Sequence, residues 1–451
     1  MRATLWRLGD ATLKSTLKSP VIVLGGGISG LTAARALQEQ QCDYLLLERC
    51  PTLGGLTRTV EVGEFCFDYT GHFLHLCRHA TPADIPYANL KDDEWATITR
   101  RSCCFVGGKF ITAPIQYNLS ELPPALFTAC ANSYDARPTL PDGEDATFRD
   151  YIVSGFGQAL ADLFLIPQNE KTMAISLQRL SRRAVRRFFP APDEKLVRRG
   201  MTPGAASAGG YNSTFWYPKS GGIGRLVDGL RSGISRYAVN QAAVAVDLRR
   251  KTLRTANQET YHWDAIVSSI PLKSLCEMTD DQDLVRAAGD LSHSSTISFN
   301  IGLRGPLRPE FEGIHWLYVP DRAIPFYRVG FYSNIGSGTT TPGHGALYVE
   351  VGMQPQEVDR TDLVHDLQLK VLESLNALGW VESREISCVV IHEMRHAYIH
   401  HTPQRDSALA AILARLREAQ VYPIGRYGLW DYISMEDSME SARTTVMGMR
   451  Q

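Results

Sequence analysis

The sequence predicts an α/β fold in which a Rossmann-like domain carries an inserted helical domain and an antiparallel sheet. Three observations predict it. A short apolar run, a glycine-rich turn and a helical pattern follow one another at residues 21–37. Residues 117–200 read largely as helices separated by loops rich in proline and glycine. Residues 296–353 then contain four segments with the alternation of antiparallel strands.

The first of these features is typical of a dinucleotide-binding turn. Val21 to Leu24 form the apolar run, and Gly25, Gly27 and Gly30 follow in GxGxxG register. The second strand, "YLLLE", ends at Glu48, 18 residues after Gly30. In such a unit the glycines make the turn, admit a pyrophosphate and let the helix pack on the strand. The acidic residue accepts hydrogen bonds from a ribose.

A second glycine turn indicates which dinucleotide binds. The segment "LGGLTRT" brings Gly54, Gly55 and Arg58 towards the same phosphates shortly after Glu48. Nicotinamide dehydrogenases usually lack this turn, whereas proteins that bind FAD have it. The expected cofactor is therefore FAD.

The pattern along the chain predicts three domains. An FAD-binding domain is expected from residues 20–112, 206–295 and 421–451, a helical domain from 113–205, and an antiparallel-sheet substrate domain from 296–420.

Individual elements can also be predicted. An apolar stripe of Val364, Leu367, Val371 and Leu375 predicts a helix over about 357–379. The segment "LQRLSRRAVRRFF", residues 177–189, also reads as a helix.

Composition excludes several classes of protein. A net charge of -1 gives no electrostatic reason to expect nucleic acid as a partner. No apolar run approaches the roughly 20 residues of a membrane-spanning helix, and the first 18 residues lack the apolar core of a signal peptide. Nine cysteines without a CxxC motif fit a reducing compartment. We therefore expect a cytoplasmic protein.

Six motifs occur in an order that resembles one family. They are "FDYTGHFLHL", "PQNEKTMAI", "YNSTFWYPKSGGIGRLVDGL", "VSSIPL", "HWLYVPDRAIPFYRVGFYSN" and "GRYGLWDYISMEDSMESA". The chain resembles the UDP-galactopyranose mutases of the eukaryotic type and related bacterial flavoproteins of polysaccharide gene clusters. These belong to the wider amine-oxidase and protoporphyrinogen-oxidase group. The similarity runs from about residue 20 to the C-terminus.

The resemblance implies a redox-neutral reaction on a nucleotide sugar. In that family the N5 atom of reduced FAD attacks the anomeric carbon of the sugar and displaces the nucleoside diphosphate. The sugar then rearranges on the flavin, so that the cofactor carries the covalent step. The sugar, the base, the source of electrons and the oligomeric state stay open, and a homo-oligomer is one option.

The resemblance also implies the residues of the site. Arg328 and Arg187 match two diphosphate arginines, with Arg186 as a rival for the second, and His72 matches a histidine that touches the flavin. The other implied substrate contacts are Gln116, Asn212, Trp316, Tyr318, Tyr398 and Tyr432. The implied cofactor contacts are Gly25, Gly27, Gly30, Glu48, Arg49, Gly54, Gly55, Leu56, Thr57, His72, Val244, Gly425, Arg426, Tyr432, Asp437 and Ser438.

The last helix has a predicted start. Ser434 and Asp437 have the spacing of a capping box. The resemblance implies that this helix N-terminus, with its partial positive charge, faces the flavin pyrimidine ring.

Two departures from the family concern the base and the reductant. The chain has "TAPIQ" where the family has a "PYPFQ"-like motif, so that Ala113 and Ile115 replace two aromatic residues and Gln116 remains. The base is therefore either not uracil or loosely held. Arg100 and Ser102 match positions that meet NADPH, but the neighbouring tyrosine is Ala113. NADPH is thus only a candidate reductant.

The segment "HEMRH", residues 392–396, matches the HExxH motif of zinc proteases. In those enzymes the motif lies on a helix, whereas the preceding "ISCVV" predicts a strand. No metal is expected.

A second class of function stays open, that of an FAD-dependent oxidase or dehydrogenase of the amine-oxidase type. The arginines and tyrosines favour the mutase, because an apolar amine has no use for two phosphate-binding cations.

Overall fold

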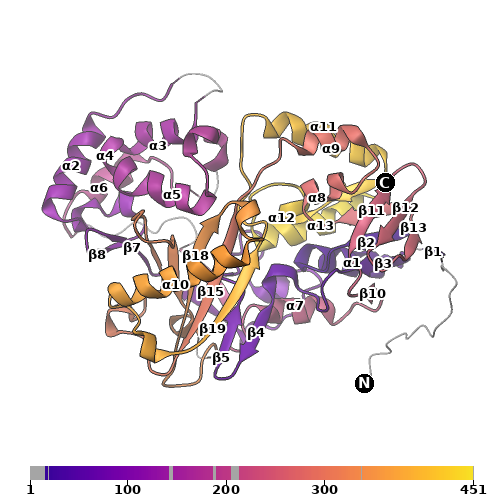
Figure 1. Ribbon diagram of the computed structural model, residues 1–451, viewed down its shortest axis with the longest axis horizontal. Helices are drawn as coiled ribbons and strands as arrows, with labels where there is room; N and C mark the ends of the chain where they lie inside the picture. Colours follow the sequence, from indigo (N-terminus) through magenta and orange to yellow (C-terminus); the bar gives the residue numbers. More distant parts are fainter. Residues whose placement is uncertain are drawn as a thin grey trace.

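The computed structural model describes residues 16–18, 20–141, 146–185, 189–204, 213–336 and 338–449. Figure 1 shows a helical unit at one end of the molecule, a parallel sheet with its helices at the other, and a large antiparallel sheet between them. The α/β class expected from the sequence is confirmed.

A five-stranded sheet forms the core of the Rossmann-like half. Its strand order is β10-β3-β2-β14-β20, and all neighbouring strands are parallel. Parallel strands of this kind are buried on both faces, which explains their unbroken apolar sequences. The strands are β10 (Tyr237–Ala238), β3 (Tyr44–Leu47), β2 (Val21–Leu24), β14 (Ala265–Ser268) and β20 (Val421–Pro423).

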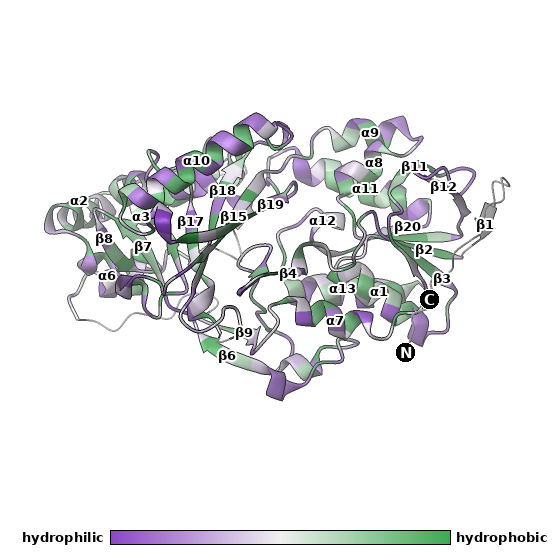
Figure 2. Ribbon diagram, turned by 60° about the horizontal axis from the view of Figure 1, so that its bottom comes forward, coloured by the Kyte–Doolittle hydropathy of each residue, from purple (hydrophilic) through white to green (hydrophobic). Residues whose placement is uncertain are grey.

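Helices cover both faces of this sheet. Val21 and Val23 point to one face and pack with helices α1, α7 and α13, whereas Ile22 and Leu24 point to the other and pack with α8, α9 and α11. Figure 2 shows β2 and β3 in the green of apolar residues between these two layers. The helices are α1 (Ile28–Glu39), α7 (Gly224–Arg231), α13 (Met435–Gly448), α8 (Leu272–Glu277), α9 (Gln282–Ala288) and α11 (Arg405–Glu418).

A seven-stranded sheet forms the core of the second half of the molecule. Its order is β19-β15-β18-β17-β16-β7-β8, and only β16 and β7 are parallel neighbours. Helix α10 (Thr361–Ala377) covers one face, where Val371 and Leu375 pack on the strands. The strands are β19 (Ile386–Met394), β15 (Ser295–Leu303), β18 (Gly345–Met353), β17 (Arg328–Phe331), β16 (Trp316–Tyr318), β7 (Ser102–Val106) and β8 (Lys109–Thr112). The four strands predicted for residues 296–353 and the helix over about 357–379 are confirmed.

The helical unit has a core of its own that continues into β7 and β8. Its helices are α2 (Pro124–Asp135), α3 (Phe148–Phe156), α4 (Gln158–Leu160), α5 (Ile166–Met173) and α6 (Glu194–Gly200).

The smaller sheets comprise β1 (Thr16–Lys18), β13 (Thr260–His262), β12 (Thr252–Thr255) and β11 (Ala243–Asp247), then β4 (Thr59–Val62) with β5 (Phe65–Asp68), and β6 (Trp95–Thr99) with β9 (Thr214–Pro218). None of the helices in the described ranges is long and apolar enough to cross a lipid bilayer.

The prediction of a helix over residues 177–189 was wrong. The described part of this segment contains two short 3-10 turns, Leu177–Arg179 and Arg182–Val185. Its backbone bonds elsewhere, because the Ser181 N–H donates to His401 and the Leu180 carbonyl accepts from Phe148. These tertiary bonds use the groups that a continuous helix would pair internally.

We expect Gly30→Ala to destabilise the Rossmann-like half. A Cβ atom at Gly30 would lie 1.8 Å from the Gly25 carbonyl oxygen, so that the helix could not keep its distance from the turn. The free energy of unfolding in urea should fall by about 3 kcal/mol or more, the upper range for overpacking. Gly305→Ala is the matched control, because its Cβ would meet no atom within 4 Å. Equal stabilities of the two variants would contradict this role of Gly30.

Candidate functional site

Two glycine turns face each other at the carboxyl ends of β2 and β3. The Gly54 N–H donates to the Gly26 carbonyl at 2.7 Å, and Gly27 and Gly54 form a parallel bridge. Gly25, Gly54 and Gly55 have φ values of 92°, 116° and 57°, which favour glycine. A Cβ atom at Gly27 would have only Gly55 Cα nearby, at 3.9 Å. The two turns thus present bare backbone to the space beside them.

Glu48 supports the first turn. One carboxylate oxygen accepts from the Gly26 N–H at 2.6 Å and the other from the Cys50 N–H at 2.8 Å. The side chain is 7% exposed. In this structure Glu48 therefore holds the turn in shape, and its predicted contact with a ribose stays a prediction.

The remaining residues near this turn are placed as follows. Leu56 and Thr57 belong to the 3-10 turn Gly55–Thr57, and Thr57 is buried. Arg49 is exposed. Val244 lies near the start of β11 and is 41% exposed, three residues from Gln241, whose N–H donates to the Glu48 carbonyl.

The start of α13 meets the start of α1. Ser434 caps α13 through the Asp437 N–H, and the Asp437 carboxylate accepts from the Ser434 N–H in return. The predicted capping box is confirmed. Gly425 begins α12 (Gly425–Gly428) with a φ of 70°, where a Cβ would lie 2.2 Å from Ser29 Oγ and 4.0 Å from Ser438 Cβ. The helix N-termini are thereby held together.

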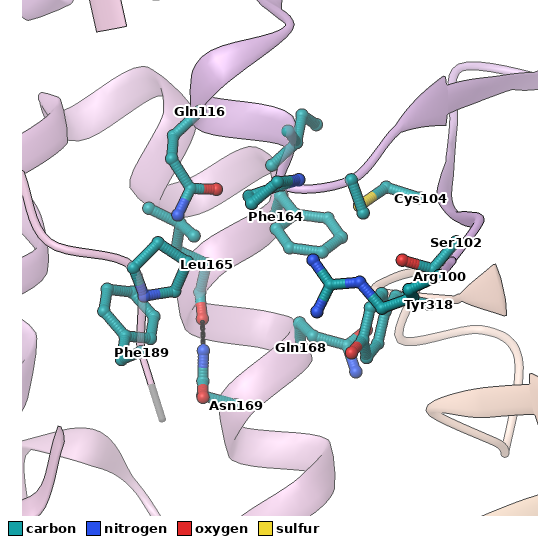
Figure 3. A pocket seen from close by; sticks show the side chains of 14 residues that line it. Arg100, Ser102, Cys104, Gln116, Phe164, Leu165, Gln168, Asn169, Phe189 and Tyr318 are labelled. Atoms are coloured by element: carbon teal, nitrogen blue, oxygen red, sulfur yellow. Dashed lines mark hydrogen bonds between the residues drawn. The ribbon is translucent and has the colours of Figure 1, made fainter. Parts of the chain in front are cut away.

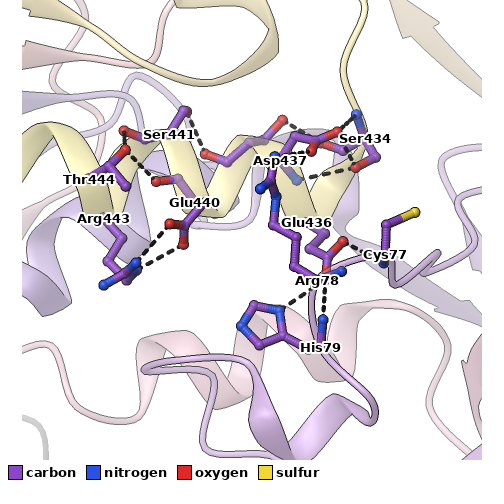
Figure 4. A network of polar contacts seen from close by, with 11 residues as sticks. Cys77, Arg78, His79, Ser434, Glu436, Asp437, Glu440, Ser441, Arg443 and Thr444 are labelled. Carbon is purple, nitrogen blue, oxygen red and sulfur yellow. Dashed lines mark hydrogen bonds and ion pairs between the residues drawn. The ribbon is translucent and has the colours of Figure 1, made fainter. Parts of the chain in front are cut away.

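A carboxylate that sequence reasoning missed ties a loop to this helix end (Figure 4). Glu436, 1% exposed, accepts from the backbone N–H groups of Cys77, Arg78 and His79 and from His79 Nδ1. Arg78 also pairs with Asp437 at 3.2 Å. The loop that follows His72 is therefore fixed to the N-terminus of α13.

The face of the seven-stranded sheet that points away from α10 carries polar and aromatic side chains. One row across it runs His392, Ser298, Glu350, Arg328 and Tyr318, each the register partner of the next. The adjacent residues on the opposite face are apolar and fully buried, namely Phe299, Val349, Val329 and Leu317. A polar row on a buried sheet is expensive unless it is paired or binds something.

Arg328 is paired within this row. Its Nε and one terminal nitrogen donate to the two carboxylate oxygens of Glu350 at 2.5 and 2.7 Å. The Glu350 side chain is 1% exposed and that of Arg328 is 17% exposed. The Glu350 carboxylate raises the pKa of Arg328 against the effect of burial, so that the guanidinium stays charged. Sequence reasoning missed Glu350.

The segment that carries His72 lies across the neighbouring row of the same face. Tyr69 stacks on His392 with ring centroids 4.0 Å apart, and Phe73 stacks on Trp316 at 5.3 Å. Between them, a Cβ atom at Gly71 would lie 2.1 Å from the hydroxyl oxygen of Tyr348. This explains the glycine in "TGHF" and places Tyr348, another residue that sequence reasoning missed, beside His72.

Two arginines face His72. Burial, together with the charges of Arg426 and Arg328, lowers the pKa of His72 to about 3. The imidazole is therefore neutral at physiological pH. Its Nδ1 atom is buried and has no hydrogen-bond partner among the described residues.

Arg426 lies in a cage of tyrosine rings. Its guanidinium carbon is 4.2 Å from the ring centroid of Tyr432, 5.8 Å from that of Tyr398 and 5.7 Å from that of Tyr427. One terminal nitrogen donates to the Ala397 carbonyl at 2.8 Å, whereas the buried Nε has no partner in the described part of the chain. The structure thus brings Arg426, Tyr398 and Tyr432 together, with Arg328 near Tyr398.

A cavity of about 170 Å³ lies between the helical unit and the sheet (Figure 3). Tyr318 lines it on the sheet side, and Gln116 lines it on the helical side. Gln116 is 2% exposed. The other lining residues are Arg100, Ser102, Cys104, Ala113, Pro114, Ile115, Phe164, Leu165, Gln168, Asn169, Phe189 and Pro190.

Three predicted substrate contacts fall outside the described residues. They are Arg187, its rival Arg186 and Asn212. The HExxH segment begins on strand β19, as expected, and not on a helix. Within the described ranges, no group of three potential ligands is arranged to hold a metal ion.

Comparisons with known proteins support this architecture. The NAD(P)-binding Rossmann-like domain family matches residues 23–83. A crystal structure of reduced UDP-galactopyranose mutase superposes with a TM-score of 0.87 and 24% identity, over 96% of this chain and 94% of that one. The chain has the fold of UDP-galactopyranose mutase. A putative protoporphyrinogen oxidase from Exiguobacterium superposes with a TM-score of 0.72 and 17% identity, over 96% of this chain and 99% of that one.

Sequence relatives match shorter parts of the chain. The coproporphyrinogen III oxidase of Mycobacterium tuberculosis is 25% identical over 278 residues, 57% of this chain. The match spans 60% of the length of that relative. A flavin-containing amine oxidase A from Canis lupus familiaris is 55% identical over 40 residues, 9% of this chain and 8% of that protein.

We expect Glu350→Ala to destabilise the protein strongly. The substitution leaves Arg328 as a largely buried cation without its partner, which typically costs about 3–5 kcal/mol. Unfolding in urea would measure the loss. Glu94→Ala is the matched control, because it removes an exposed pair with Arg225, with side chains 41% and 43% exposed. That loss should be about 0–1 kcal/mol. Similar losses of unfolding free energy in both variants would show that the Arg328–Glu350 pair stabilises the protein no more than an exposed pair does.

Proposed function

We propose that the protein is an FAD-dependent sugar-nucleotide mutase, which converts a nucleoside diphosphate sugar between pyranose and furanose forms without net oxidation. The observation that carries the proposal is the polar cluster of Arg328, Arg426, Tyr398 and Tyr432, close to the His72 segment and the Rossmann-like half. Arginine forks and tyrosine hydroxyls are suited to a diphosphate. An amine or a reduced ring would offer no anionic group to these cations.

The described residues fit FAD. The open side of Gly27 between the two glycine turns leaves room for a pyrophosphate. His72 Nδ1 and Arg426 Nε are buried and have no hydrogen-bond partner within the described ranges, and a flavin ring would satisfy such groups. The α13 N-terminus presents its free N–H groups and partial positive charge at the same place. These residues would hold the cofactor beside the polar face of the seven-stranded sheet.

Each part of the site then has a task. Reduced flavin, when bound, supplies a nucleophile for the anomeric carbon. Arg328, oriented by Glu350, would hold a phosphate through its remaining N–H groups, and Tyr398 and Tyr432 would donate hydroxyl hydrogens to the same group. Arg187 and Asn212 complete the proposed substrate contacts. Neutral His72 can donate or accept one hydrogen bond without adding charge.

The cavity beside Gln116 is the proposed location of the base. The Gln116 amide and the Tyr318 ring, on opposite sides of the cavity, are suited to a flat polar group. Ala113 and Ile115 line the same cavity, so the substitutions noted in the sequence affect the part of the site that would contact the base. We therefore leave the base unassigned among the common nucleotides.

We expect Gly27→Val to abolish cofactor binding without unfolding the protein. Gly27 has a φ of -75°, which valine tolerates, and its Cβ meets no atom closer than 3.9 Å. The added side chain would occupy the approach of the pyrophosphate. Purified wild-type protein should be yellow and release FAD on heating, whereas the variant should be colourless with an unchanged circular dichroism spectrum. Full flavin occupancy in the variant would exclude this binding mode.

The electron balance of the reaction tests whether the protein acts as a redox-neutral mutase. The protein should convert one member of a panel of nucleotide sugars only after reduction by dithionite or NADPH, with no electrons consumed per product. Chromatography of the products and an oxygen electrode would measure both quantities.

The alternative is an FAD-dependent oxidase, which the sequence match to coproporphyrinogen III oxidases favours. It predicts the opposite result, namely activity of the oxidised protein with stoichiometric hydrogen peroxide. Peroxide formation matched to substrate loss would therefore replace the mutase with the oxidase.

A further inference from the structure

Helix α5 lies between the cavity and the loop that joins β16 to β17. Gln168 and Lys171 are three residues apart on this helix, so their side chains lie on the same face. Gln168 lines the cavity together with Phe164, Leu165 and Asn169, and Figure 3 shows it beside Tyr318. The helix therefore touches the cavity at one end and the loop at the other.

Lys171 binds this loop with all of its donors. Its Nζ atom donates to the carbonyl oxygens of Val319, Asp321 and Phe326 at distances of 2.7, 2.8 and 2.5 Å. An ammonium group has three N–H donors, so each one is used. One turn earlier, Gln168 Nε2 donates to the Tyr327 carbonyl at 3.0 Å. Four carbonyls of one loop are thus bound by one helix.

The ends of this loop are the two proposed substrate contacts. Val319 directly follows Tyr318, which lines the cavity, and Tyr327 directly precedes Arg328. The β16–β17 ladder already fixes Tyr318 opposite Arg328, and the Tyr327 N–H donates to the Glu350 carbonyl at 3.0 Å. The contacts with α5 therefore set where the helical side of the cavity lies relative to Tyr318 and Arg328.

A lysine at this largely buried position carries a desolvation cost. Burial lowers the pKa of Lys171 to about 7, and the nearby Asp321 charge raises it only in part. An exposed ion pair between Glu170 and Arg322 also joins α5 to the loop, at 2.5 Å. If the only task were to attach the loop to the helix, surface pairs of this kind would do so without placing a cation in the interior.

We propose that Lys171 is a positioning residue that sets the spacing between the cavity and Arg328, so that one ligand can occupy both. The proposal rests on the proposed function, because a nucleotide has a base for the cavity and a diphosphate for Arg328. Two linked groups bind more tightly than the separate groups when the sites are correctly spaced. Lys171 would therefore raise the affinity for the linked ligand and leave the affinity for each separate group unchanged.

The test uses three probes on the flavin-loaded protein and on Lys171→Met. They are a nucleoside for the cavity, inorganic pyrophosphate for the cations, and the nucleoside diphosphate that contains both. The best binder among UDP, GDP, ADP and TDP decides which nucleoside is used. Calorimetry measures the diphosphate, and ligand-observed NMR measures the weaker fragments.

We expect Lys171→Met to bind the nucleoside and pyrophosphate within about twofold of wild type, but the nucleoside diphosphate about tenfold or more less tightly. Lys171→Gln keeps two N–H donors and should show a smaller loss. If the methionine variant does not fold, Lys171→Gln replaces it in the test. Arg322→Gln is the matched control, because it breaks the exposed pair with Glu170 and leaves the carbonyl contacts intact. All three affinities should then stay at wild-type values.

The outcomes separate this inference from the proposed function. Wild-type protein that binds none of the four diphosphates would overturn the proposed function, and the inference with it. If wild type binds one of them, two results would overturn the inference alone. One is an equal loss for all three probes, which is the mark of general structural support. The other is no selective loss of the diphosphate.

Discussion

The ion pair between Arg328 and Glu350 is the interaction on which the candidate site depends. The two residues are register partners on adjacent strands, so the pair forms only if β17 and β18 align correctly. A shift of β17 by one residue would turn Arg328 to the face covered by α10, away from Glu350. The same register places Tyr318 and Ser298 on either side of the pair. A buried charge pair thus specifies the alignment of the strands as well as the direction of the guanidinium group.

The pair also decides how charge is distributed in the site. Glu350 balances Arg328, which therefore offers oriented donors with little net charge. Arg426 faces tyrosine rings, and the structure shows no carboxylate within ion-pair distance of it among the described residues. Because both guanidinium groups and burial keep His72 neutral, the histidine adds no charge. The net positive charge of the described site therefore comes mainly from Arg426, close to where a reduced flavin would carry its negative charge.

Features determined by short segments of sequence could be predicted. The glycine turns, the capping box at Ser434 and the strand that carries His392 depend on residues close in sequence, and the structure has all three. Glu350 and Tyr348 were missed because their roles depend on which strand lies next to theirs. The helix expected over residues 177–189 failed for a related reason, since tertiary hydrogen bonds replaced those within the segment.

Asp68 explains why the two halves of the molecule meet at His72. Its buried carboxylate accepts from the Tyr217 and Thr59 hydroxyls and from the Ile223 N–H, all in the segments around the Rossmann-like half. Its backbone carbonyl accepts from Asn300 and Tyr332 of the sheet half. Burial raises the pKa of this carboxyl to about 7, a cost that the three donors reduce. One residue thus joins both halves four positions before His72, which ties the segment of the histidine to the Rossmann-like half and to the sheet.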